Sequence, residues 1–100
     1  MTTLNDTLNG VRLRIARGWT QRTYALDESS RPVPSTSPDA VRWCLAGALF
    51  AVCALEDGDY RQAEERLAPF VLGQSLSAWN DAPGRTQADV LGLLDAASVS

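Results

Sequence analysis

The feature that most constrains this chain is an apolar stretch over residues 40–55, which contains a single charged side chain. Ser37, Pro38 and Asp39 come just before it, and these residue types favour the N-cap and first turn of a helix. A helix that is apolar on every side is normally buried on every side. The sequence therefore predicts a central buried helix over about residues 38–56.

Further helices are predicted on both sides of the central one. Each begins with a side chain that can cap it and a polar partner three positions on: Thr3 with Asp6, Asp59 with Gln62, and Thr86 with Asp89. Tyr60 and Phe70 belong to the apolar stripe of the second of these helices and are expected to be buried. Pro69 should end or kink that helix, and residues 75–80 should form one short turn.

Residues 19–34 differ from the helical segments, because aromatic and β-branched residues are followed by a turn and by Pro32 and Pro34. This composition indicates either a short β-hairpin or an extended flap. The expected fold is mainly α: a single domain over residues 1–100, built as a small bundle of four to five helices with a possible short hairpin at about residues 19–34.

Composition and charge limit the classes of function that this chain can have. The chain has 100 residues, 45% of them hydrophobic, a net charge of −3 and a pI near 4.7. An acidic chain argues against direct nucleic-acid binding, since nucleic-acid binders are normally basic. No apolar run reaches the ~20 residues that span a bilayer, and the first residues do not have the pattern of a secretory signal. We therefore expect a cytoplasmic protein without a membrane partner.

The chain contains no His, which removes the usual general base near neutral pH and the commonest metal ligand. It also lacks a CxxC pair and the glycine-rich motifs that bind phosphates. We expect no metal and no cofactor, and the absence of these groups makes a non-enzyme the favoured interpretation. Two cysteines, Cys44 and Cys53, lie nine residues apart on the predicted central helix, too far for a disulfide.

Cys44 is the sharpest single catalytic candidate. A thiol near a helix start can have a lowered pKa, but a helix that begins at Ser37 places Cys44 two turns along, where the dipole effect has faded. A buried core thiol is therefore favoured over a reactive one.

The second candidate site is the polar loop that leads into the last helix. A loop feeding a helix N-terminus can bind an anion, and Arg85 would add a charged donor. The simpler interpretation, which we favour, gives Asn80 and Asp81 an Asx turn and Thr86 a capping role.

Two tryptophans beside chain reversals are further binding candidates. Trp19 and Trp79 are expected to pack together, closing the 19–34 segment onto the last helix. An exposed Trp at either position would mark a binding surface, because Trp is enriched at interaction hot spots. Trp43 is expected in the core.

Two sequence motifs occur together, RWCLAGAL at residues 42–49 and NDAPGRT at residues 80–86. They resemble a family of small bacterial and phage proteins that is named only as a domain of unknown function, and the similarity runs from about residue 11 to residue 97. The resemblance implies a shared fold. It does not imply any particular activity, because none is known for the family. It also implies that four side chains lie near one another: Cys44, Asn80, Asp81 and Arg85. A His often follows the Thr in that family, whereas this chain has Gln87, so a partner base for Cys44 is missing.

The expected function is a non-catalytic protein-interaction or regulatory module, monomeric or homodimeric. Residues 43–100 contain eight acidic side chains against three Arg; a solvated surface is the simpler interpretation of this charge, and an acidic face that meets a basic partner is the alternative. An accessory protein of a phage or mobile element, such as an inhibitor of a bacterial defence system, is one concrete form. The alternative is a thiol-dependent enzyme or small-ligand-binding protein that uses Cys44 and the 80–86 loop.

Overall fold

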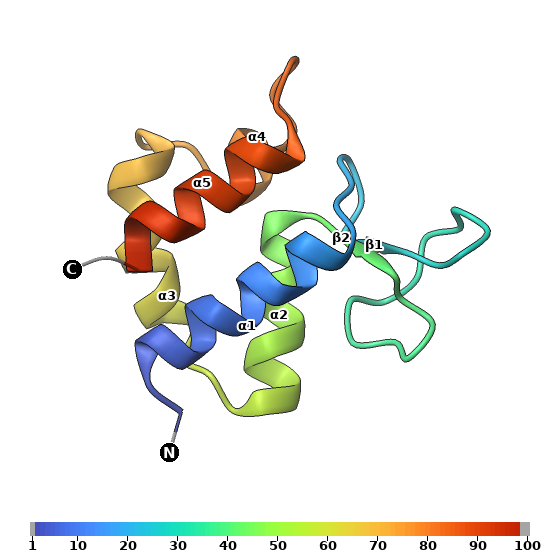
Figure 1. Cartoon of the computed structure of the whole chain (residues 1–100), viewed down its shortest axis with the longest axis horizontal. Helices are drawn as coiled ribbons and strands as arrows, with labels where there is room; N and C mark the ends of the chain where they lie inside the picture. Colours follow the sequence, from blue (N-terminus) through green and yellow to red (C-terminus); the bar gives the residue numbers. More distant parts are fainter. Residues whose placement is uncertain (1, 99–100) are drawn as a thin grey trace.

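The protein, described over residues 2–98 by a computed structural model, consists of helices with one very small sheet (Figure 1). The elements in chain order are α1 (Leu4–Arg17), β1 (Ala25–Leu26), β2 (Arg42–Trp43), α2 (Leu45–Glu56), α3 (Tyr60–Leu67), the 3-10 turn η1 (Ala68–Val71), α4 (Leu76–Asn80) and α5 (Gln87–Ser98). The mainly helical fold predicted from the sequence is confirmed.

The predicted cap residues begin three of these helices. At α1 the Asp6 amide donates to the Thr3 hydroxyl and the Thr3 amide donates to the Asp6 carboxylate, both at 3.1 Å. Asp59 accepts the Gln62 amide at the start of α3, and Thr86 and Asp89 form a reciprocal pair at the start of α5. Each cap satisfies backbone donors that the helix leaves without a partner and stabilises it by about 1 kcal/mol.

The core forms where α1 packs between α2 and α5 (Figure 1). Its fully buried aliphatic side chains come from all three helices: Leu8, Val11 and Ile15 of α1, Leu45, Leu49 and Val52 of α2, and Val90 and Leu94 of α5. Burying each of them contributes roughly 1.5–3 kcal/mol relative to exposure. This packing is the main stabilising interaction of the fold.

The central helix begins later than the sequence predicted, at Leu45 rather than near residue 38. Ser37 caps a single turn, in which its hydroxyl accepts the Asp39 amide at 3.1 Å, and no helix follows. The chain then runs extended as β2, antiparallel to β1, with Ala25 opposite Trp43. Backbone groups that a helix would bond internally are bonded to other segments instead, as when the Trp43 amide donates to the Gly18 carbonyl at 3.1 Å.

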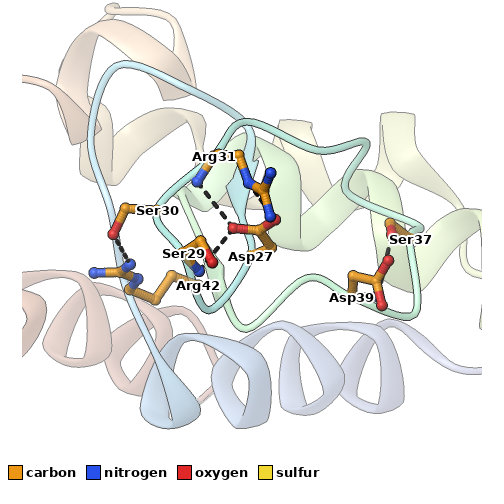
Figure 2. A network of polar contacts seen from close by, with 7 residues as sticks. All are labelled: Asp27, Ser29, Ser30, Arg31, Ser37, Asp39 and Arg42. Carbon is orange, nitrogen blue, oxygen red and sulfur yellow. Dashed lines mark hydrogen bonds and ion pairs between the residues drawn. The ribbon is translucent and has the colours of Figure 1, made fainter.

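The 19–34 segment contains a tight reversal at residues 25–33. The Val33 amide donates to the Ala25 carbonyl and the Asp27 amide to the Arg31 carbonyl, at 3.1 and 3.0 Å. Figure 2 shows the Asp27 carboxylate at its centre, accepting the Ser29 and Arg31 amides at 2.9 Å. The hydrogen bond from the Arg31 amide is the main reason why the pKa of Asp27 is lowered. The strand partner of β1, however, is β2.

The expectation that the apolar central helix is buried on every side is wrong. Phe50 and Leu55 of α2 are exposed, and Phe70 in η1, also predicted to be buried, is exposed. Tyr60 is only partly buried. The domain is too small to enclose all of its apolar side chains, so some of them remain at the surface. Among residues 2–98, no helix has both the length and the apolar character needed to cross a bilayer.

Candidate functional site

Asn80, one of the predicted binding residues, is a fully buried structural node. Its Oδ1 accepts the Trp19 indole N–H at 2.8 Å and the Leu45 amide at 3.0 Å. Its Nδ2 donates to the Thr20 carbonyl at 3.1 Å and to the Asp81 carboxylate at 3.0 Å. Two donors and two acceptor positions are all that a side-chain amide has. Asn80 therefore joins three segments of the fold and has no hydrogen-bonding capacity left for a ligand.

Asp81 holds the loop before β1. Its Oδ1 also accepts the amide of Arg22 at 2.9 Å, and Arg22 has the left-handed φ of 71°. Gln21 adds two bonds from its side-chain amide, to the carbonyls of Asn80 and Ala82, at 3.0 and 3.2 Å. Residues 20–22 are thereby fastened to the end of α4. Arg22 tolerates a conformation that is rare outside glycine because these bonds fix its backbone.

Arg85, Thr86 and Trp79 form a second structural unit beside Asn80. The Arg85 Nε donates to the Trp79 carbonyl at 2.8 Å, and its guanidinium lies 3.9 Å from the centroid of the Trp79 ring. Thr86 is engaged in the α5 cap with Asp89. The Thr86 cap matches the predicted capping role, whereas Asn80 and Asp81 bond distant segments instead of forming the predicted Asx turn. Trp79 is buried and Trp19 is partly buried, so neither is an exposed tryptophan of the kind that would mark a surface.

Cys44 does not lie two turns inside a helix, as the sequence suggested, but is the N-cap of α2. Its Sγ accepts the Gly47 amide at 3.2 Å. The residue is buried and borders a hollow of about 380 Å³ whose walls include Arg22, Ser77 and Asp81. Burial raises the pKa of the Cys44 thiol most, Asp81 raises it further, and the hydrogen bond from Gly47 opposes them. The thiol is therefore protonated at neutral pH.

Only some of the four side chains that the resemblance placed together lie near one another. Asn80 bonds the amide next to Cys44, and Asp81 shares a hollow with Cys44, but Arg85 is committed to Trp79. Gln87, at the position of the family's His, donates to the Ile15 carbonyl at 2.7 Å and links α5 to α1. Within residues 2–98, no group of His, Cys, Asp or Glu is arranged to hold a metal ion.

The accessibility and protonation of the Cys44 thiol can be tested by its reaction with a thiol reagent. A Cys53→Ser variant isolates Cys44. At pH 7.5 we expect its alkylation to be about tenfold or more slower in the folded protein than in denaturant, since burial blocks the reagent and the raised pKa reduces the thiolate. A Cys44→Ser variant, which keeps the partly buried Cys53, gives the reference rate. Equal folded and unfolded rates for Cys44 would revive the reactive-thiol alternative.

A feature that sequence analysis missed is a row of three aromatic rings, Tyr24, Phe50 and Tyr60, which we call the aromatic row. Tyr24 and Phe50 meet edge to face with centroids 5.4 Å apart, and Phe50 and Tyr60 stack at 4.8 Å with an interplanar angle of 10°. Tyr24 is 52% exposed and Phe50 38% exposed. The loop before β1, the middle of α2 and the first residue of α3 thus present neighbouring aromatic rings.

A hollow adjoins the Tyr24 end of the aromatic row. Tyr24 is itself a wall of the hollow that contains Cys44 and Asp81. At the other end, burial raises the pKa of Tyr60 most, and the nearby Glu64 carboxylate raises it further. We call the row together with this hollow the aromatic face. Its signal in the sequence was one aromatic residue in each of three segments, the loop before β1, α2 and α3, and this signal becomes visible only when the packing of the segments is known.

The fold and this face define a small, mainly helical domain with an exposed aromatic surface and structural polar motifs. The chain belongs to the Family of unknown function (DUF6197), whose family model matches residues 1–99. No curated protein and no solved structure matches the chain.

Proposed function

We propose that this protein is a non-catalytic protein-interaction module and that the aromatic face is its contact surface. The observation that carries the proposal is the exposure of neighbouring rings: Tyr24 and Phe50 are more than one-third accessible although each contacts another ring. Clustered aromatic side chains are typical of the residues that dominate binding free energy. Exposed rings that already stack lose little side-chain entropy on binding.

The charge around the row favours a basic partner. The hollow beside Tyr24 is lined by Asp81 and Arg22, and the Glu64 carboxylate lies near enough to Tyr60 to raise its pKa. Aromatic faces attract ammonium and guanidinium groups, and nearby carboxylates add a longer-range attraction. We therefore propose that the partner segment carries Lys or Arg together with at least one apolar side chain that packs on Phe50.

A regulatory role is consistent with this surface. The chain has no His, and the raised pKa of Cys44 opposes thiolate chemistry, so the residues support binding better than catalysis. An acidic, aromatic surface can also occupy a basic channel that normally receives nucleic acid. Inhibition of a bacterial defence protein by a phage accessory protein is one concrete form of the proposal.

The test is selection of random short peptides displayed on phage against the immobilised protein, followed by affinity measurement on the best sequences. We expect enrichment of peptides that combine Lys or Arg with an aromatic or aliphatic residue. Phe50→Ala should weaken their binding about tenfold, since a central aromatic contact contributes more than 1 kcal/mol.

Leu13→Ala is the matched control, because Leu13 is also an exposed apolar residue but lies on α1, outside the aromatic face. Its peptide affinity should equal that of the wild type, and urea denaturation should show that both variants are folded. The proposal is wrong if no basic sequence is enriched, or if Phe50→Ala binds the selected peptides as tightly as Leu13→Ala does.

A further inference from the structure

A second hollow, of about 340 Å³, lies between the last turn of α1 and the loop that precedes β2. Its walls include Arg14 and Arg17 of α1, the consecutive hydroxyl residues 35–37, and Trp43. No residue of this hollow belongs to the aromatic face.

Both arginines are held over one indole ring. The guanidinium carbons of Arg14 and Arg17 lie 6.0 and 5.7 Å from the centroid of Trp43. Basic residues in the last turn of a helix interact favourably with its dipole, which explains why they occur there. The dipole alone does not require both side chains to converge on one ring beside a row of hydroxyl groups.

The hollow retains positive charge. Arg14 donates to the Glu56 carboxylate at 2.8 Å, whereas Arg17 forms no ion pair within residues 2–98. Glu56 thus balances one of the two guanidinium groups. The side chain of Arg17 is exposed and its N–H donors are accessible to a ligand.

The opposite wall is fixed and can donate hydrogen bonds. The Trp43 indole N–H donates to the Ser35 carbonyl at 3.0 Å and holds the loop against the ring. The Ser37 oxygen accepts the Asp39 amide, so its own O–H proton stays free to donate. Guanidinium groups and hydroxyls at the mouth of a small hollow form the donor set that tetrahedral oxyanions require.

We propose that this hollow binds a small phosphate monoester, with Arg14 and Arg17 on the phosphate oxygens and the exposed Leu55, which also lines the hollow, against the organic group. The volume is at the lower end of the range for small-molecule sites, which favours a compact ligand over a dinucleotide. This inference is independent of the proposed interaction at the aromatic face.

The test follows the Trp43 indole N–H by NMR during titration with phenyl phosphate, since that group donates into the wall of the hollow. We expect a saturable shift of this signal, weakened by added NaCl and about tenfold weaker in affinity in Arg17→Gln. Phenol, which has the ring without the phosphate, should cause no comparable shift. Inorganic phosphate should compete with phenyl phosphate, because the phosphate supplies most of the recognition.

Arg61→Gln is the control, because Arg61 is a highly exposed arginine that pairs with Glu65 on the surface of α3, away from this hollow. It should bind phenyl phosphate like the wild type, and unchanged indole signals of Trp19 and Trp79 should show that Arg17→Gln is folded. The proposal is overturned if the Trp43 signal does not saturate, if phenol shifts it as strongly, or if Arg17→Gln binds as tightly as Arg61→Gln.

Discussion

Replacing Asn80 with Ala is expected to lower the free energy of unfolding by about 3 kcal/mol, because the substitution leaves several buried groups without partners. The Leu45 amide and the Trp19 indole N–H both lose their acceptor, and the Thr20 carbonyl loses a donor. All of these lie in the region where α4, α2 and the loop before β1 meet. Urea denaturation followed by circular dichroism measures the change through the midpoint and the slope.

Asn9→Ala is the matched control for this prediction. The Asn9→Ala substitution makes the same chemical change at an exposed position of α1, where Ala has a higher helix propensity than Asn. The stability of this variant should therefore equal or slightly exceed that of the wild type. A loss below about 1 kcal/mol for Asn80→Ala would mean that water replaces the amide and that Asn80 is not the node described above.

The helix starts could be predicted because their signals are local. A capping side chain and its partner are three residues apart, and no distant segment needs to be known to recognise them. Thr3 with Asp6, Asp59 with Gln62, and Thr86 with Asp89 all form the predicted hydrogen bonds. The sequence was informative wherever the stabilising contact lay within one helical turn.

The start of the central helix could not be predicted because its cause is not local. Ser37, Pro38 and Asp39 read as a helix start, yet the same residues form an isolated turn. What decides between them is the pairing of β2 with β1 and with the Gly18 carbonyl, some twenty residues away in the chain. Cys44 then takes the capping role, and the site gains a thiol at a helix N-terminus that the sequence had placed within the helix.

The aromatic face was missed for a related reason. The apolar stripe of an amphipathic helix indicates which side of the helix is buried. Residues 45–55 are apolar on all sides, so their sequence does not indicate a buried side. Only the packing of α1 and the neighbouring segments determines that Phe50 lies at the surface beside Tyr24. The polar loop, by contrast, was recognisable as structural, but the distant partners of Asn80 and Asp81 were not predictable from it.

Gly47→Ala is expected to destabilise the protein by about 3 kcal/mol, although Ala normally favours a helix by about 1 kcal/mol over Gly. A Cβ at this position would lie 2.1 Å from the Tyr24 carbonyl oxygen and 2.8 Å from the carbonyl carbon. Those atoms belong to backbone, so the first turn of α2 and the residue before β1 would have to separate. Urea denaturation again measures the loss.

Gly92→Ala is the control that separates the steric clash of a new Cβ from the effect of helix propensity, because a Cβ at Gly92 of α5 meets no atom within 4 Å. We expect it to stabilise the protein by about 0.5–1 kcal/mol. Since Gly47 contacts the backbone of Tyr24, Gly47→Ala should also displace one ring of the aromatic row and weaken binding of the selected basic peptides, while Gly92→Ala leaves it unchanged. A Gly47→Ala variant as stable as Gly92→Ala would show that α2 does not press against Tyr24, and the position of the aromatic row would then need another cause.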